Sequence, residues 1–238
     1  MEMGGYINLE AIVLAGGLGT RLAGVVSEVP KPMALVAGKP FLAYLLDNLK
    51  AQGVTHVILA VCHLKEHIME YFGNEYRGMA LDYSVEDTPL GTGGAIRKAL
   101  ELCREERAFV CNGDSFFDVD LHTLRAYATT HEFQIVIVLK PLTNFSRYGT
   151  VETGDQGMVL SFREKQPCAQ GKINGGIYDI KRDALMDYPV RFSMEQDCFP
   201  QLLKNGQVGS VDSEGYFIDI GIPEDYARVQ KESERLKG

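Results

Sequence analysis

The apolar run Ala11-Ile-Val-Leu-Ala15 is followed at once by the glycine-rich segment Gly16-Gly-Leu-Gly-Thr-Arg-Leu22. A short, continuous apolar run is typical of a strand that is buried on both faces of a parallel sheet. Glycines directly after the strand let backbone N–H groups approach an anion closely, because no Cβ intrudes. In open α/β sheets, ligands bind at these carboxyl ends of the strands. The stretch therefore predicts an α/β fold with an anion site beyond its first strand.

Strand-like and helix-like segments alternate through the first half of the chain. Apolar runs and helical spacing predict strands at 56–61, 80–85 and 107–111, and helices at 41–52, 65–72 and 94–103. The second half is richer in strands, expected at 133–139, 149–153, 158–163, 173–180, 208–211 and 216–218. Helices are expected there at 182–186, at 193–204 and from residue 223. We therefore predict an α/β fold with a Rossmann-like, mixed but mainly parallel sheet flanked by helices. No linker or repeat interrupts it, so residues 1–238 are expected to form a single domain.

Charge and composition exclude several classes of function. The chain has 24 Lys and Arg residues against 32 Asp and Glu residues, a formal net charge of −8. Nucleic-acid binding needs a basic face, so no nucleic-acid partner is expected. A pocket in an acidic protein can still be locally positive and take a small anion. No membrane partner is expected either, because no run approaches the roughly 18 apolar residues of a span. The first ten residues lack the features of a signal peptide, and the five cysteines are scattered without a CxxC pair, so a cytoplasmic location is expected.

Two common phosphate-binding loops do not fit the glycine segment. A P-loop needs G-x-x-x-x-G-K-[ST], which the chain lacks. A dinucleotide fingerprint would begin at Gly17 and needs a glycine at its sixth position, where Leu22 stands. Pro30 and Pro32 also prevent a helix from running straight out of the loop.

Together with Pro30-Lys-Pro32, the segment resembles the signature of the sugar-1-phosphate nucleotidylyltransferases, which is G-G-x-G-T-R-L followed by P-K-P. The resemblance continues in family order with Asn112-Gly-Asp114, Glu164-Lys165, Asn174-Gly-Gly-Ile-Tyr178 and Phe217-Ile-Asp-Ile-Gly221. It covers nearly the whole chain. It implies a glycosyltransferase-A-like nucleotidyltransferase fold, with the nucleotide bound by residues 10–120 and the sugar phosphate by residues 133–222. The implied reaction transfers a nucleotidyl group from an NTP to a sugar 1-phosphate and releases pyrophosphate.

This chemistry needs cations, because two polyanions meet and negative charge builds up in an in-line transition state. Arg21, with its planar fork, suits the pyrophosphate, and Lys31, between two prolines, suits the α-phosphate and the attacking oxygen. The resemblance implies that these two residues are catalytic. The expected nucleotide-binding residues are Leu14, Ala15, Gly16, Gly17, Gly19, Thr20, Arg21, Glu86, Leu90, Gly91 and Thr92.

A magnesium ion is the expected cofactor. Mg²⁺ prefers one or two carboxylates together with phosphate oxygens and water. Asp114 follows the expected strand 107–111 in an Asn-Gly-Asp turn, and the resemblance makes it a metal ligand. The second ligand, Asp219, lies 105 positions further on, so the pairing of the two is implied by the resemblance alone.

The base and the sugar are expected to be GTP's guanine and a heptose. The carboxylate of Glu86 can accept hydrogen bonds from the two N–H donors on the edge of guanine, whereas the edge of uracil or thymine has one such donor. Four segments place the resemblance nearest the family branch that acts on a heptose 1-phosphate: Gly38-Lys-Pro-Phe41, Pro89-Leu-Gly-Thr-Gly-Gly-Ala-Ile96, Arg147-Tyr-Gly-Thr-Val151 and Asp219-Ile-Gly-Ile-Pro-Glu-Asp-Tyr226. The sugar-phosphate residues that it implies are Gly149, Glu164, Lys165 and Asn174. One departure from the family pattern is Gln166, which separates Lys165 from Pro167.

Several alternatives remain open at this point. The same reaction with UTP or GTP could use glucose, mannose or N-acetylmuramate 1-phosphate. The pair Asp118-Val-Asp120 suggests a metal-dependent glycosyltransferase, although Asp120 is better explained as the N-cap of a helix beginning near residue 121. An inactive sugar-nucleotide sensor and a homodimer are also left open.

Overall fold

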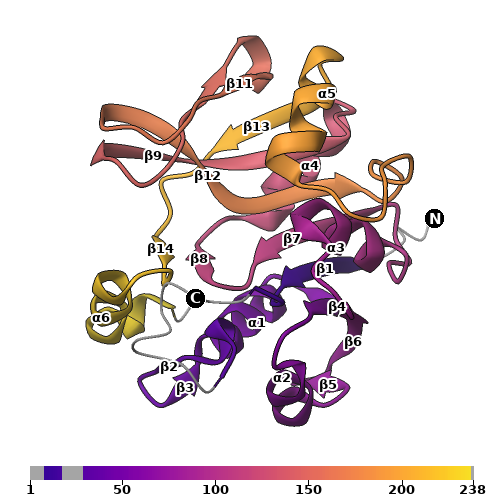
Figure 1. Cartoon of the computed structure of the whole chain (residues 1–238), viewed down its shortest axis with the longest axis vertical. Coiled ribbons are helices and arrows are strands. Elements are labelled where there is room, and N and C mark those ends of the chain that lie inside the picture. Colours follow the sequence, from indigo (N-terminus) through magenta and orange to yellow (C-terminus); the bar gives the residue numbers. More distant parts are fainter. Residues whose placement is uncertain (1–7, 18–28, 237–238) are drawn as a thin grey trace, which may run out of the picture.

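The computed structural model describes residues 8–17 and 29–236 of the 238-residue chain. Eight strands form one sheet in the order β13-β9-β12-β7-β1-β4-β6-β5 (Figure 1). Strands from both halves of the chain therefore belong to the same sheet. Among the described residues, no helix is both long enough and apolar enough to cross a membrane.

The first half of the chain builds the parallel part of the sheet. Its strands are β1 (Leu9–Leu14), β4 (Val54–Val61), β6 (Met79–Val85) and β7 (Arg107–Asn112). All of their pairings with one another are parallel, and β1 lies between β4 and β7. The connecting helices are α1 (Phe41–Ala51), α2 (Lys65–Phe72) and α3 (Gly91–Leu100). Because the order reverses at β1, a crevice is expected at the carboxyl ends of β1 and β7.

The second half adds antiparallel strands and a small hairpin. Its sheet strands are β9 (Ile135–Phe145), β12 (Cys168–Lys181) and β13 (Val208–Asp212). At the other edge of the sheet, β5 (Glu75–Tyr76) of the first half pairs antiparallel with β6. β12 runs antiparallel to both β7 and β9, and this makes the sheet mixed. The separate hairpins are β10 (Val151–Thr153) with β11 (Val159–Phe162), and β2 (Leu35–Val36) with β3 (Lys39–Pro40). The remaining helices are α4 (Leu121–Thr130), α5 (Phe199–Lys204) and α6 (Pro223–Lys231).

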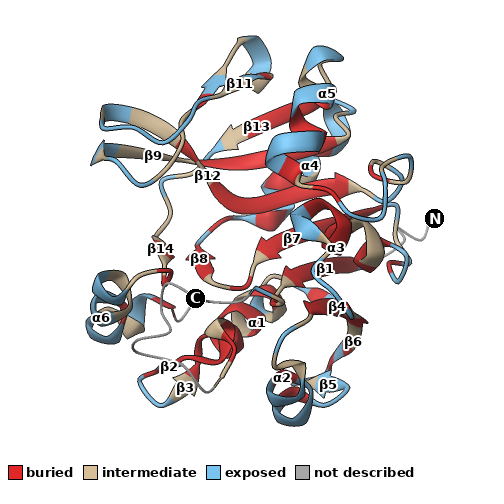
Figure 2. Cartoon of the chain, in the orientation of Figure 1, coloured by how far each residue is buried: buried red, intermediate tan, exposed pale blue. Residues whose placement is uncertain are grey.

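The core forms two layers of apolar side chains, one on each face of the sheet. In β1, Ala11 and Val13 face one layer, and Ile12 faces the other. Helices α1, α2 and α4 cover the first layer, whereas α3 and α5 cover the second. The central strands are accordingly buried along their length (Figure 2). The prediction that the run 11–15 is a strand buried on both faces is confirmed.

The predicted α/β fold with a mixed, mainly parallel sheet and a strand-rich second half is confirmed, and one predicted helix is wrong. Residues 182–187 form turns rather than a helix. Three successive i→i+3 hydrogen bonds end there at the N–H of Tyr188, and Pro189 follows, so too few residues remain for an α-helix. The helix expected at 94–103 begins three residues earlier, at Gly91. The helix expected at 193–204 begins as a π-helical turn (Met194–Cys198) and continues as α5.

Candidate active site

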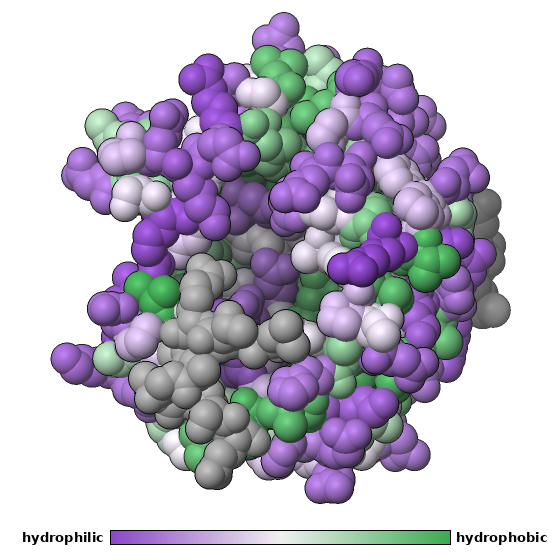
Figure 3. Space-filling model, viewed as in Figure 1, coloured by the Kyte–Doolittle hydropathy of each residue, from purple (hydrophilic) through white to green (hydrophobic). Residues whose placement is uncertain are grey.

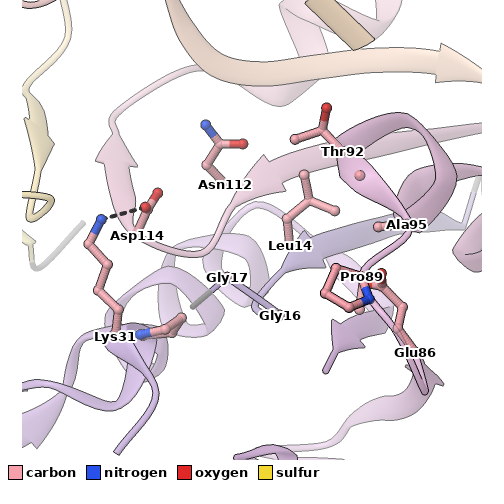
Figure 4. Close-up of a pocket in the computed structure, with 13 residues that line it drawn as sticks. Leu14, Gly16, Gly17, Lys31, Glu86, Pro89, Thr92, Ala95, Asn112 and Asp114 are labelled. Carbon is pink, nitrogen blue, oxygen red and sulfur yellow. Dashed lines mark hydrogen bonds and ion pairs between the residues drawn. The ribbon is translucent and has the colours of Figure 1, made fainter. Parts of the chain in front are cut away.

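A pocket of about 490 Å³ opens at the carboxyl edge of the parallel strands. Each neighbouring strand of that part of the sheet contributes to its wall. The lining residues are Leu14, Gly16, Gly17, Lys31, Pro32, Ala60, Glu86, Pro89, Gly91, Thr92, Ala95, Asn112 and Asp114. Figure 4 shows Lys31 and Asp114 at one end and Glu86 and Pro89 at the other, with Leu14 and Gly16 between them. On the face seen in Figure 3, the surface is hollowed between the part that holds β9–β12 and the part that holds α6.

Glu86 lies at the end of the pocket next to β6. Its side chain is buried, and its Oε2 accepts from the backbone N–H of Leu90 at 2.8 Å. Burial raises the pKa of the Glu86 carboxyl, while the hydrogen bond from Leu90 and the charge of Lys98 lower it. A Cβ on Gly16 would lie 3.4 Å from Glu86 Oε1 and 3.1 Å from the Cβ of Cys62. Gly16 therefore leaves room beside an acceptor that is already oriented.

Lys31 lies at the other end, against two carboxylates. Its Nζ donates to Asp114 Oδ2 at 2.6 Å and lies 3.9 Å from Asp219 Oδ1, with the lysine side chain only 10% exposed. Burial raises the pKa of Asp219, the neighbouring Asp114 raises it further, and Lys31 lowers it. One ammonium group thus partly neutralises two acidic groups that come from distant parts of the chain.

Local structure explains how these three side chains meet. Pro30 precedes a single 3-10 turn (Lys31–Met33), which carries Lys31 into the pocket wall. A Cβ on Gly113 would lie 2.6 Å from the carbonyl oxygen of Leu14, so only glycine lets the turn before Asp114 pass so close to β1. The short strands β8 (Ser115–Phe117) and β14 (Phe217–Asp219) pair antiparallel, with Asp219 opposite Ser115. This pairing brings Asp219 to the residue that follows Asp114.

Residues 147–149 border this carboxylate pair. The ring of Tyr148 packs edge-on against Phe217 of β14, the strand that ends at Asp219, with ring centroids 6.2 Å apart. Burial raises the pKa of Tyr148, and the charge of Asp219 raises it further. Arg147 forms an ion pair with Asp225 in α6 and donates to Tyr148 Oη at 2.9 Å. Gly149 passes so close to Arg163 that a Cβ would collide with the carbonyl oxygen of Arg163.

The chain matches one known family along nearly its whole length. Residues 10–235 match the model of the family described as nucleotidyl transferase. The chain belongs to the nucleotidyl transferase family. It is 45% identical over 220 residues to D-glycero-alpha-D-manno-heptose 1-phosphate guanylyltransferase of Campylobacter jejuni, and the match covers 92% of this chain and 97% of that relative. It is also 45% identical over 227 residues to the protein of the same name from Aneurinibacillus thermoaerophilus, covering 94% and 98% of the two chains.

A solved structure agrees with the fold of this nucleotidyl transferase. HddC from Yersinia pseudotuberculosis, in complex with GMP-PN, superimposes with a TM-score of 0.86 at 33% identity. The match covers 94% of this chain and 99% of that one. The predicted family and the predicted nucleotidyltransferase fold are both confirmed.

The nucleotidyl transferase pocket includes most, but not all, of the residues expected to bind the nucleotide. Six of them line it: Leu14, Gly16, Gly17, Glu86, Gly91 and Thr92. Ala15 and Leu90 lie beside it, where their backbone N–H groups bind Ala60 O and Glu86 respectively. Gly19, Thr20 and Arg21 lie outside the described residues. Sequence reasoning missed Pro32, Ala60, Pro89, Ala95 and Asn112. Pro32 and Asn112 belong to the Pro-Lys-Pro and Asn-Gly-Asp segments of the family pattern, and Pro89 and Ala95 belong to the segment 89–96. Among these five residues, only Ala60 had no signal.

The expected sugar-phosphate residues lie outside the pocket lining. Glu164 and Lys165 are exposed on the loop between β11 and β12, and their side chains make no hydrogen bond or ion pair with the described residues. Gly149 lies beside this loop. Asn174 lies at a bulge of β12, where it accepts from the N–H of Gly176 at 3.0 Å and donates to Tyr178 Oη at 2.8 Å. A Cβ on Gly176 would lie 2.5 Å from the side chain of Asn112, so this bulge packs against the pocket.

The Asp118-Val-Asp120 pair has a structural explanation in Asp120. Asp120 is the N-cap of α4 and accepts from the backbone N–H groups of His122 and Thr123 at 2.9 and 3.1 Å. Its hydrogen bonds with Thr123 lower the pKa of its carboxyl. Asp118 is exposed, and neither carboxylate lines the pocket.

We expect Asp118→Asn to leave kcat close to the wild-type value. We expect Asp120→Ala to lower the free energy of unfolding by about 1 kcal/mol, as the loss of an N-cap does, and to leave kcat unchanged. Pyrophosphate release and chemical denaturation measure the two effects. A metal-dependent glycosyltransferase that uses this pair would instead lose its activity in both variants.

Proposed function

We propose that this enzyme transfers a guanylyl group from GTP to D-glycero-α-D-manno-heptose 1-phosphate. The observation that carries the proposal is the arrangement of one pocket, with a buried acceptor, Glu86, at one end and Lys31 with Asp114 at the other. The names of the two relatives that are 45% identical support this choice of base and sugar. The enzyme would act in the cytoplasm on these small molecules, without nucleic acid or membrane.

The reaction forms one phosphorus–oxygen bond and breaks another. A phosphate oxygen of the sugar 1-phosphate attacks the α-phosphorus of GTP, and pyrophosphate leaves in line from the opposite side. Lys31 would stabilise the negative charge on the α-phosphate and the incoming oxygen, because its ammonium is already held at that end of the pocket. Arg21 would hold the departing pyrophosphate, a role that rests on the family signature.

Asp114 and Asp219 fit a Mg²⁺ site. Both are carboxylates at one end of the pocket, where each lies within 4 Å of Lys31 Nζ. Phosphate oxygens and water would supply the other oxygen ligands that Mg²⁺ prefers. The bound ion would neutralise part of the charge on the phosphates. Asp219 also accepts from the N–H of Gly221 at 2.7 Å, which fixes the carboxylate in place.

The sugar phosphate would bind on the side of the second half of the chain. Gly149 and Asn174 border the site through Tyr148 and Gly176, and Glu164 and Lys165 are exposed beside Gly149. An exposed lysine without a partner has its three donors available for a phosphate. Residues 10–120 and 133–222 would thus divide the nucleotide and the sugar phosphate between them.

Glu86 would read guanine. The Watson–Crick edge of guanine presents two donors next to each other, and a carboxylate offers two acceptors that match them. The hydrogen bond from Leu90 orients Oε2 before the base arrives, and Oε1 has no partner among the described residues.

We expect Glu86→Gln to raise KM for GTP by about 10- to 100-fold, because a buried hydrogen bond to a charged group contributes about 1.5–3 kcal/mol. The preference for GTP over the other three nucleotides should fall with it, since an amide turns a donor toward the guanine donors. Asp87→Asn is the matched control, because Asp87 is the exposed next residue. Initial rates against each NTP measure both effects, and unchanged selectivity in Glu86→Gln would remove this residue from base recognition.

A matrix of substrates tests the proposal as a whole. The four NTPs are each paired with the 1-phosphates of D-glycero-α-D-manno-heptose, mannose, glucose and N-acetylmuramate, and kcat/KM is measured for pyrophosphate release. We expect the highest kcat/KM for GTP with the heptose. A higher kcat/KM with mannose 1-phosphate would show that the proposed sugar is wrong, and a higher kcat/KM with UTP would show that the proposed base is wrong.

A further inference from the structure

Residues 90–94 begin α3 and form one wall of the pocket, and their glycines have an unexpected neighbour. Residues 190–193 lie directly on this turn, although they come from the second half of the chain about a hundred positions away. A Cβ on Gly91 would lie 2.5 Å from the carbonyl oxygen of Phe192. A Cβ on Gly93 would lie within 2.7 Å of three carbons of the Phe192 ring. A Cβ on Gly94 would collide with the carbonyl oxygen of Val190.

Hydrogen bonds tie the same two segments together. Phe192 donates from its N–H to Leu90 O at 3.0 Å, and its carbonyl oxygen accepts from the N–H groups of Gly93 and Gly94 at 3.1 and 3.3 Å. These two N–H groups belong to the first turn of α3, where N–H groups have no partner within the helix. Because they donate to Phe192, they are not available to bind a phosphate. Thr92, which lines the pocket, accepts from the N–H of Met194 at 3.0 Å and donates to Glu195 at 3.3 Å.

The ring of Phe192 is itself held firmly. It is 3% exposed and stacks on Tyr188 with ring centroids 4.9 Å apart. The turn that it supports carries the N–H of Leu90 that orients Glu86, and it also carries Gly91 and Thr92 of the pocket wall. Because Phe192 is hydrogen-bonded to Leu90, and Leu90 to Glu86, a shift of Phe192 would also move Glu86 and the neighbouring Thr92.

We infer that residues 190–195 position the base-binding turn, and that Phe192 is a positioning residue for the nucleotide. The glycines at 91, 93 and 94 then serve close packing against this segment. The segment follows β12 in the chain, so residues of the second half support a turn of the first half. This inference rests on the proposed nucleotide pocket.

A compensating pair of substitutions tests the inference. Gly93→Ala pushes a methyl group into the Phe192 ring, and overpacking of this kind costs enough to raise KM for GTP about tenfold or more. Phe192→Ala removes the ring, so the double variant Gly93→Ala/Phe192→Ala has space for the methyl group. Phe192→Ala alone should raise KM for GTP by about threefold, because the ring that supports the turn is lost. We expect KM for GTP of the double variant to fall from the Gly93→Ala value to this level, with KM for the sugar 1-phosphate unchanged throughout.

Gly94→Ala is the matched control. Its methyl group meets the backbone oxygen of Val190, which no side-chain substitution removes, so Phe192→Ala should not rescue it. Each variant is compared for KM for both substrates, kcat and thermal midpoint. Three results would overturn the inference: no change in KM for GTP in Gly93→Ala, an equal rise in both KM values, or equal rescue of the Gly93 and Gly94 variants by Phe192→Ala.

Two further comparisons keep the test decisive. If Gly93→Ala is not recovered as folded protein, Phe192→Ala and Phe192→Leu replace it, with a rise in KM for GTP expected in the first and near-wild-type KM in the second. An unchanged KM for GTP in Phe192→Ala would then overturn the inference. If wild type prefers another NTP, the proposed base is wrong, and the same cycle with that NTP still tests the positioning role.

Discussion

Replacing Lys31 by methionine will lower kcat by about 10²- to 10³-fold, the usual loss when one preorganised donor to a developing negative charge is removed. Methionine keeps much of the length and apolar character of the side chain but removes the ammonium group. The effect should fall on kcat rather than on KM for GTP, because the charge that Lys31 stabilises grows in the transition state. Pyrophosphate release at saturating concentrations of both substrates measures it.

Lys39→Met is the matched control for this prediction. Lys39 lies eight positions further on and pairs with Asp47, away from the pocket lining. Its loss should leave kcat within about twofold of wild type, as is usual for a partly exposed ion pair. A Lys31→Met enzyme that also keeps kcat within twofold would show that Lys31 is not catalytic.

Replacing Asp219 by asparagine will lower kcat by about 10²-fold or more at 1 mM Mg²⁺ if Asp219 is a metal ligand, because a neutral amide is a poor ligand for Mg²⁺. The amide oxygen can still accept from the N–H of Gly221, so the local fold should persist. The concentration of Mg²⁺ that gives half-maximal activity should rise in the variant. Titration of activity with Mg²⁺ measures this shift.

The specific part of this second prediction is the metal dependence. Asp118→Asn changes an exposed carboxylate outside the pocket lining and should leave the Mg²⁺ titration unchanged. If Asp219→Asn lowers the rate without moving the Mg²⁺ midpoint, the residue acts on the reaction in another way, and the assignment of Asp219 as a ligand fails.

The fold was predictable from sequence where the signal was local. The run 11–15 has only one reasonable structure, because its five apolar side chains must be buried and the run is too short to form a stable helix. The helices at 41–51 and 65–72 have apolar residues at helical spacing and a glycine near their ends, and the structure has them at those places. Residues 182–187 had weak spacing and a proline close behind, and there the helix prediction failed.

Contacts between segments that are distant in the sequence could not be predicted from local sequence patterns. Nothing near Gly91, Gly93 and Gly94 indicates that Phe192 lies on them, so the motif reads as a loop for backbone contacts with a ligand. The meeting of Asp114 and Asp219 depends on the pairing of β8 with β14, which are strands of three residues each. Strands that short carry too little alternation to be paired from sequence.

The net charge of −8 is a property of the whole chain and says little about the pocket. Lys31 is one of 24 basic residues, yet its burial against two carboxylates gives it a defined position that the exposed lysines lack. A local arrangement of this kind is what a reaction between two polyanions requires.

The central claim is that one pocket joins an NTP to a sugar 1-phosphate. Its most direct test is pyrophosphate release by the wild-type enzyme with Mg²⁺, measured with GTP alone, with D-glycero-α-D-manno-heptose 1-phosphate alone, and with both. We expect release only with both substrates, in equal amount to the GDP-heptose formed. Release from GTP alone at the same rate, or no release from any NTP and sugar 1-phosphate pair, would contradict it.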